Sequence, residues 1–299
     1  MKDDDKSRIV PSPELTQCIQ ALRSILRRYI RLIDGIIAVL VGHESAKAVR
    51  EEDLQIDEPM VLATVPVLQA IGSSSNTLLS LSETPGLQTR DCYSIVRSIV
   101  EACINICYTI AEGPDAADQA LRYARQKAFR DLERQSRVGE SAIHLVYSAI
   151  PDPGTIEGLE DDLEEFTSRT GREKGWTDLS VDDRIVIAGE RLGGSVLNSL
   201  HFARFSIYRH SSEILHGTLF SALYFWGTIS PSGPHSSLQE WAENVGQQHM
   251  MILFAAIVAI SAVVEAFHRT YGLPRAFEQS REFFNELREI PYLQDDATP

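Results

Sequence analysis

Apolar residues recur three or four positions apart along most of this chain, and the pattern predicts long helices. The segment from Pro11 to Gly42 has this spacing behind a Ser12-Pro13 helix start. Met60 to Leu81 and Thr89 to Ala111 are similar, and a Pro-Gly turn separates them.

The second half continues in the same way. Ala116 to Ile150 is predicted as one long helix, followed at residues 151–180 by a connection with one short helix. A capped helix start is expected at Ser180, and later helices at about 196–226, 237–271 and 275–288. Because no stretch alternates convincingly, the fold class is all-α. We expect a single domain over 11–290 with flexible tails at 1–10 and 291–299.

Charge and cysteine content limit the possible partners. The 299-residue chain has a net charge of −14, which argues against broad, nonspecific binding to nucleic acids but leaves room for a local basic patch. Its four cysteines have no clustered metal-ligating neighbours, so reduced, buried thiols are expected and no metal site. No cofactor motif is visible either.

One run is apolar enough to raise the question of a membrane. Met250 to Val264 is only about 15 residues long, short of the ~20 that span a bilayer, so a helix buried on all sides is expected. The opening Met1 to Lys6 is polar and acidic, without a secretory signal. With the reduced thiols, this predicts a cytoplasmic protein that does not enter a membrane.

A polar stripe interrupts the predicted helix over 196–226. Tyr208, Ser212 and His216 are spaced by four and stack along one side, with Arg209 and Glu213 beside them. Their neighbours in the helix are largely apolar. A buried polar stripe is costly unless its members bond one another or another group, so this stripe predicts a partner.

A second polar stripe lies in the helix over 89–111. Arg97, Glu101 and Asn105 are spaced by four among apolar residues. They either form an intrahelical surface salt bridge or join a buried network with the helix that carries Arg209. We favour the network, because this helix is apolar around most of its circumference.

The predicted helix over 116–150 carries the one plausible cationic stripe. It either faces the phosphates of RNA or pairs with Asp131 and Glu133. Ion pairing is the more common outcome for such a stripe. Its members fall close to one helix face: Arg122, Arg130, Arg134 and Arg137.

The chain lacks a glycine-rich phosphate loop, an HExxH motif and a nucleophile elbow. The sequence Arg209-His210, five further residues and His216 resembles the Arg-polar-x(4–5)-His signature of the HEPN superfamily. An Arg-x3-Glu helix (Arg97 to Glu101) followed by a Tyr-Arg-x2-Ser-Glu-x2-His helix (Tyr208 to His216) is similar to a bacterial family of uncharacterised helical proteins often placed near HEPN.

The resemblance implies a HEPN-like bundle, with a core around 60–270 and additional N- and C-terminal helices. It also implies metal-independent RNA cleavage by a homodimer, in toxin or phage-defence biology, with an antitoxin or regulatory protein as partner. His216 would transfer the proton, Arg209 would stabilise phosphoryl charge, and His210 would position phosphate or His216, while Tyr208 and Glu213 would orient the set. The alternative is a noncatalytic scaffold, or a nucleotide- or protein-binding module, in which Arg209 and His216 belong to a structural polar network.

Overall fold

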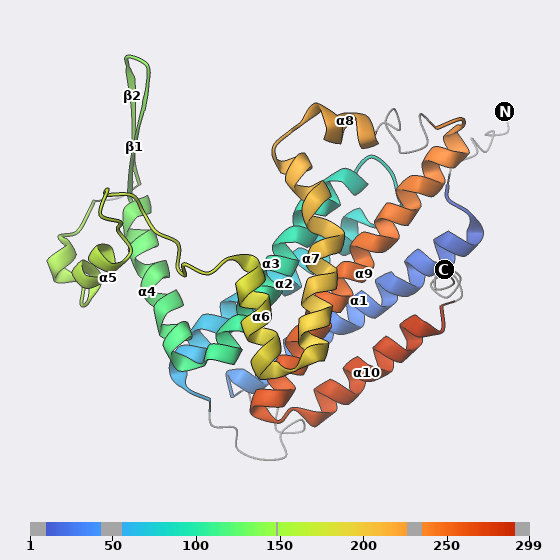
Figure 1. Ribbon diagram of the computed structural model, residues 1–299, viewed down its shortest axis with the longest axis horizontal. Helices are drawn as coiled ribbons and strands as arrows, with labels where there is room; N and C mark the ends of the chain where they lie inside the picture. Colours follow the sequence, from blue (N-terminus) through green and yellow to red (C-terminus); the bar gives the residue numbers. More distant parts are fainter. Residues whose placement is uncertain (1–9, 43–55, 148, 226–234, 291–299) are drawn as a thin grey trace, which may run out of the picture.

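The computed structural model describes residues 10–42, 56–147, 149–225 and 235–290, and most of them are helical (Figure 1). The mainly helical fold class is thereby confirmed, while the predicted tails lie almost wholly outside the described residues. The main bundle consists of five long helices, with a sixth packed along it. These are α1 (Pro13–Leu40), α2 (Glu58–Leu81), α3 (Thr89–Glu112), α7 (Gly194–Leu215), α9 (Leu238–Tyr271) and the sixth, α10 (Pro274–Arg288).

The start of α1 shows how local sequence fixes a helix end. Ser12 is the N-cap, and its hydroxyl oxygen accepts a hydrogen bond from the Leu15 amide at 3.4 Å. The same hydroxyl donates to a carboxylate oxygen of Glu243 at 2.8 Å, and the Ser12 amide donates to the other oxygen. The predicted cap is confirmed, and it also fastens α1 to α9.

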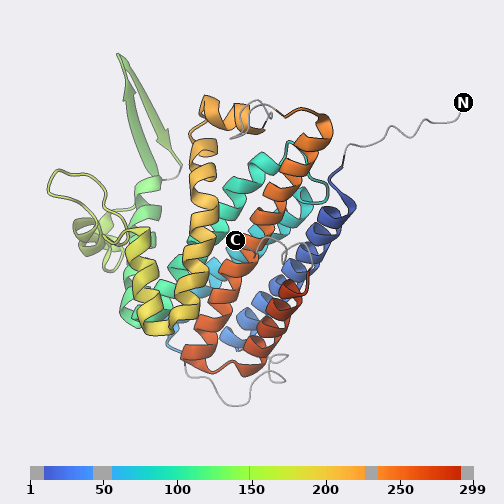
Figure 2. The same cartoon turned by 45° about the vertical axis from the view of Figure 1, so that its right-hand side comes forward.

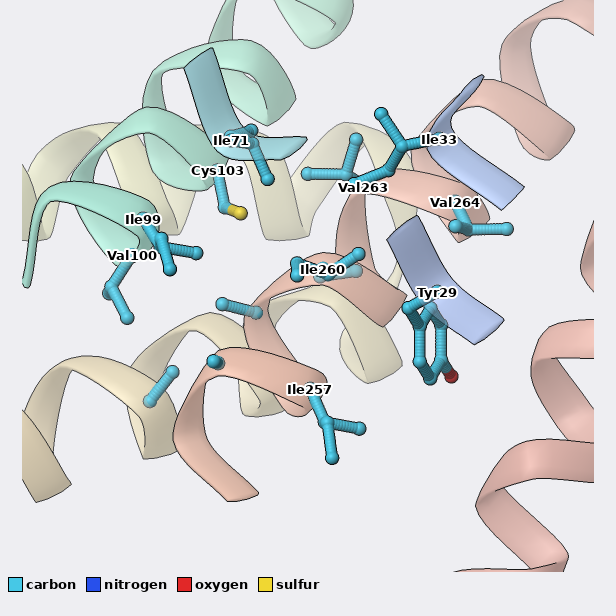
Figure 3. Packing of buried hydrophobic residues seen from close by; sticks show 14 of the residues in the cluster. Tyr29, Ile33, Ile71, Ile99, Val100, Cys103, Ile257, Ile260, Val263 and Val264 are labelled. Carbon is cyan, nitrogen blue, oxygen red and sulfur yellow. The ribbon is translucent and has the colours of Figure 1, made fainter. Parts of the chain in front are cut away.

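Helix α9 is the centre of the bundle and packs against α1, α3 and α7. Its Ile257, Ile260 and Val263 lie in the core with Cys103 of α3 and Tyr29 of α1 (Figure 3). Among the described helices, α3 and α9 are long and apolar enough to cross a membrane, but 83% of the most apolar stretch of α9 and 56% of that of α3 lie inside the protein. The predicted burial of the apolar run is confirmed.

The cysteines behave as predicted from their surroundings. Cys18, Cys92, Cys103 and Cys107 are all buried free thiols. Burial raises the pKa of Cys18 and of Cys92 to about 11. Since the thiolate is the reactive form, these side chains act as small apolar groups in the core.

The predicted long helix over 116–150 is wrong in its second half. Helix α4 (Pro114–Asp131) is followed by an antiparallel hairpin of β1 (Glu133–Val138) and β2 (Ser141–Val146), which projects from the bundle (Figure 1). The turn contains Gly139 at φ +61°, a conformation that glycine adopts without strain. The chain turns back there because glycine disfavours a continuing helix, while the β-branched Val138, Ile143 and Val146 favour strands on either side.

The connection over 151–180 is confirmed and contains a 3-10 turn (Pro153–Thr155) and the short α5 (Leu159–Glu165). The predicted start at Ser180 is also confirmed, because α6 (Val181–Leu192) begins with a capping box. The Ser180 hydroxyl accepts from the Asp183 amide at 3.2 Å, while the Asp183 carboxylate accepts from the Ser180 amide at 3.1 Å.

The predicted helix over 196–226 is interrupted. Helix α7 ends at Leu215, and α8 (Leu219–Phe225) follows in a new direction; Trp226 lies outside the described residues. Gly217 causes the break with φ +61°, since its amide donates to the Ile214 carbonyl and the Thr218 amide donates to the Glu213 carbonyl. His216 is therefore the C-cap of α7 and not a mid-helix residue.

Candidate functional site

The candidate site is the outward face of the C-terminal half of α7. Ile207 and Ile214 point into the core. Phe205, Arg209 and His216 are spaced by four and seven residues, which places them on the opposite side of the helix, and they are exposed. The sequence pattern predicted a buried stripe here, but its two most chemically informative members face solvent.

Arg209 and His216 have no partner in the described part of the chain. Neither side chain makes a hydrogen bond, an ion pair or a ring contact there, and both are exposed. Within the described part of the chain, these two residues therefore do not belong to the internal network that the alternative interpretation expected. His216 also lies at the carbonyl end of α7.

His210 occupies a different environment from its neighbour Arg209. Its imidazole stacks on Tyr224 of α8, with ring centroids 5.1 Å apart and planes 22° apart, and it contacts Tyr93 of α3 at 5.6 Å. Burial lowers the pKa of His210, and the positive charge of Arg209 lowers it further, against an opposing effect of Glu213. A largely neutral, stacked imidazole at pH 7 fixes the end of α7 against α3 and α8.

Tyr208 connects α7 to the second polar stripe. Its ring lies between the guanidinium carbons of Arg97, at 4.8 Å from the centroid, and of Arg204, at 5.0 Å. Arg97 also donates to Glu101 at 2.9 Å along α3. Burial raises the pKa of the Tyr208 hydroxyl, and nearby Glu101 adds to that effect.

The second polar stripe divides between two neighbours. Arg97 and Glu101 reach toward Tyr208, whereas the side-chain oxygen of Asn105 accepts a hydrogen bond from Arg184 of α6. The Arg97–Glu101 ion pair is intrahelical and half-exposed, as the alternative interpretation had it, and Arg97 also contacts the ring of Tyr208 on α7. These contacts do not extend to Arg209.

The remaining members of the first stripe shape the end of α7. The Glu213 carboxylate accepts a hydrogen bond from the Thr218 hydroxyl at 2.7 Å, across the turn that leads to α8. Ser212 is half-buried between these groups and the outward face. Glu213 thus positions the turn that presents His216.

The predicted cationic stripe does not share one helix face, because Arg134 and Arg137 lie on β1. Arg122 pairs with Asp118 and Glu165, so its charge is neutralised locally. Arg122 is thus ion-paired, but its partners are not the predicted Asp131 and Glu133.

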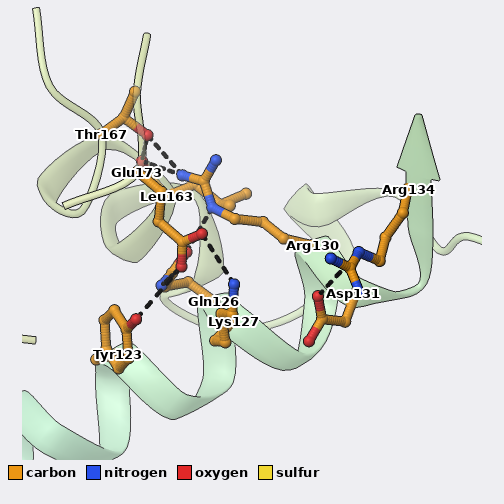
Figure 4. A network of polar contacts seen from close by, with 9 residues as sticks. All are labelled: Tyr123, Gln126, Lys127, Arg130, Asp131, Arg134, Leu163, Thr167 and Glu173. Atoms are coloured by element: carbon orange, nitrogen blue, oxygen red, sulfur yellow. Dashed lines mark hydrogen bonds and ion pairs between the residues drawn. The ribbon is translucent and has the colours of Figure 1, made fainter. Parts of the chain in front are cut away.

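Figure 4 shows the same pattern further along α4. Arg130 donates to the Thr167 hydroxyl and the Leu163 carbonyl, and Lys127 pairs with Glu173 at 2.9 Å. Arg134 lies 3.9 Å from Asp131, and the exposed Arg137 makes no hydrogen bond or ion pair with described residues. Arg122 and Arg130 therefore hold α4 against α5 and the following loop, whereas Arg134 and Arg137 lie on the hairpin and do not contact α5.

Sequence reasoning missed the exposed apolar residues beside Arg209 and His216. Phe205 is 85% exposed, Leu219 72% and Leu215 57%. The spacing of four between Phe205 and Arg209 was a usable signal, since it places both on one face. The described residues contain no group of three or more His, Cys, Asp or Glu side chains that could hold a metal ion.

Comparison with known proteins gives one match. A model described as "Family of unknown function (DUF5677)" matches residues 70–233, more than half of the chain, and this region includes both polar stripes. No curated protein and no solved structure matches.

Proposed function

Since this chain belongs to a family of unknown function (DUF5677), we propose a function from its own residues: a metal-independent ribonuclease that acts at the outward face of α7. The observation that carries the proposal is the exposure of Arg209 and His216 on one face, without a partner among the described residues. A guanidinium and an imidazole that contact no other described side chain are available to a substrate. The resemblance to the HEPN signature supplies the reaction class.

The reaction needs two groups at one phosphodiester. His216 removes the proton from a ribose 2′-hydroxyl as that oxygen bonds to the adjacent phosphorus, because an imidazole exchanges protons near neutral pH. Arg209 donates hydrogen bonds to the phosphoryl oxygens, where negative charge grows. The bond from phosphorus to the 5′ oxygen breaks, and that oxygen takes up a proton. The products carry a 2′,3′-cyclic phosphate and a 5′-hydroxyl.

Three neighbours position these two groups. His210 is held by its stack with Tyr224, and Glu213 holds the turn that follows His216. Tyr208 anchors this part of α7 to Arg97. We assign His210 this positioning role in place of phosphate contact, because its ring is already occupied by aromatic neighbours.

A homodimer fits the surroundings of the site. Phe205, Leu215 and Leu219 leave a large apolar area in water beside Arg209 and His216. Apolar patches on a folded protein are typical of interaction surfaces. In the proposed dimer these residues meet their symmetry mates, which brings two Arg209–His216 pairs to one RNA-binding cleft.

The cellular setting follows from the same resemblance. We place the enzyme in the cytoplasm, where its buried thiols stay reduced. Its role is in toxin or phage-defence biology, and a regulatory or antitoxin protein controls it by covering the outward face of α7. RNA selection would come from that face, because the overall net charge of −14 repels nucleic acid elsewhere.

The test is cleavage of a mixed RNA pool in EDTA, with end-group analysis of the products. The wild type is expected to leave 2′,3′-cyclic phosphate ends, and His216→Ala and Arg209→Ala are expected to lose that activity while staying folded. His201→Ala, on the same helix, and Arg169→Ala, an exposed arginine in the connection, are the matched controls and should keep it. A wild type that cleaves nothing, or a His216→Ala variant as active as the controls, would refute the proposal.

A second candidate is a noncatalytic module that binds a partner protein, and the hairpin favours it. By the strand register, Val138, Ile143 and Leu145 share one face, and all three are exposed. Glu133 and His144 form an ion pair on the other face. A partner would add an extended segment with alternating apolar side chains to an open strand edge. RNA inactivity combined with partner capture that Ile143→Ser abolishes would favour this candidate.

A further inference from the structure

A separate open cavity lies between α1 and α2. Its volume is about 520 Å³, which is within the range of small-ligand sites. Helix α9 stands between α1 and α7, so this cavity is not part of the outward face of α7 (Figure 2). The polar lining residues are Arg23, Arg27 and Arg31 from α1, Asn76 and Ser80 from α2, and Glu83 just beyond it.

The three arginines form a row of cations. Their spacing of four residues puts them on one line along α1, with a rise of about 6 Å between successive members. Arg27 and Arg31 are exposed and make no ion pair or hydrogen bond with described residues. Arg28, on the neighbouring face, pairs with Glu286. Glu83 is the one carboxylate in the lining, so the row is only partly balanced in a protein that is acidic overall.

Arg23 is the most unusual member of the row, because only 5% of it is exposed. It donates to the Leu79 carbonyl at 2.9 Å and to the Ser82 hydroxyl at 3.0 Å, and both acceptors are neutral. Its Nε is buried without a hydrogen-bond partner in the described part of the chain. Burial lowers the pKa of Arg23, and Arg27 lowers it further, against an opposing effect of Glu83. A buried cation without a carboxylate partner is costly, and an anion in the cavity would offset that cost.

The distribution of positive charge along α1 indicates which kind of anion would bind. Three arginines against one glutamate leave a net charge of +2 around the cavity, spread over about 12 Å of helix. A single carboxylate or phosphate would meet only part of the row. Guanidinium groups match phosphate oxygens in bidentate geometry, and Asn76 and Ser80 add polar groups on the facing helix.

We propose that the cavity between α1 and α2 binds a small ligand with two or more adjacent phosphate groups, held by Arg23, Arg27 and Arg31. Arg23 is preoriented by its contacts with α2, and the two exposed arginines close over the outer phosphates. Asn76 and Ser80 face the part of the ligand that lies against α2. Glu83 limits the site to ligands whose charge is concentrated at the arginine row.

The test is isothermal titration calorimetry of the full chain with inorganic triphosphate, without added metal. The wild type is expected to bind saturably, and Arg27→Gln/Arg31→Gln to bind roughly tenfold or more weakly, since hydrogen bonds to charged groups are the strong ones. Both arginines are exposed, so the variant is expected to fold normally. Arg169→Gln removes an exposed arginine elsewhere that pairs with no described residue, and this variant should bind as the wild type does.

Two further arms identify the ligand. A nucleoside triphosphate that binds more tightly than inorganic triphosphate indicates contacts beyond the phosphates, and equal binding indicates recognition of the phosphates alone; either supports the site. His216→Ala should bind triphosphate normally, so failure of the ribonuclease proposal leaves this one standing. The proposal is overturned if the wild type shows no saturable binding, if the double variant binds equally well, or if only RNA without terminal phosphates binds through Arg27 and Arg31.

Discussion

Substitutions on opposite sides of α7 give the sharpest test of how the polar stripe is used. Ile207 is fully buried, whereas Arg209 and His216 face solvent without partners among the described residues. We consider three variants: Ile207→Ala, Arg209→Ala and His216→Ala. If the stripe served the fold, the polar substitutions would be as damaging as the apolar one.

The magnitudes follow from burial. Ile207→Ala removes three buried carbon atoms and leaves a cavity, which costs about 2–5 kcal/mol of unfolding free energy. Arg209→Ala and His216→Ala remove exposed, unpaired groups and should each change it by no more than about 0.5 kcal/mol. The stability difference between the two sides of the helix is therefore at least about 1.5 kcal/mol.

Equilibrium unfolding in urea, followed by far-ultraviolet circular dichroism, measures these values. The midpoint should fall for Ile207→Ala and stay near that of the wild type for the other two, with the same slope in all cases. A loss of about 1.5 kcal/mol or more in His216→Ala or Arg209→Ala would refute the reasoning. That result would return both residues to a structural network.

Three further predictions test the rest of the structure. Burial lowers the pKa of His249 to about 4, so on acidification this side chain takes up its proton in the unfolded chain first. The free energy of unfolding should therefore fall by on the order of 3 kcal/mol as the pH drops from 6.5 to 4. His249→Gln should flatten this pH dependence, and an unchanged pH dependence would contradict the assignment. The hydroxyls of Tyr29 and Ser280 share a buried hydrogen bond of 2.9 Å, so Tyr29→Phe should lower the free energy of unfolding by about 1–2 kcal/mol. The double variant with Ser280→Ala should lose less than the two single variants together. Strictly additive losses in urea unfolding would argue against the bond. Replacing the exposed hairpin at 133–146 with a Gly-Ser linker should change the thermal midpoint of the helical body little, and a large drop would show that the hairpin supports the core.

The sequence predicted correctly those features that depend on interactions between residues close together in the chain. The caps at Ser12 and Ser180 depend on a hydroxyl and a nearby amide, and both are present as expected. The apolar run of α9 has too few polar groups to face water, so its burial was predictable. Long helices were found for the same reason, because their spacing of apolar residues is repeated many times.

The hairpin and the exposure of the candidate site could not be predicted, because they depend on which other segments pack against each surface. The hairpin was missed because the helical pattern fades gradually after α4, while the signal from Gly139 is a single residue. At the candidate site, spacing placed Arg209 and His216 on one face but did not reveal that this face is open. Phe205 is one of the apolar neighbours of the polar stripe, yet no described residue covers it. Gly217 was the missed signal for the end of α7.

The most direct measurement for the central claim is the end chemistry of RNA incubated in EDTA with the wild type and with folded His216→Ala. If the outward face of α7 is catalytic, the wild type produces 2′,3′-cyclic phosphate ends and the variant produces none. If the two proteins leave the RNA equally intact, or cleave it equally, His216 is not a catalytic residue and the ribonuclease assignment is wrong.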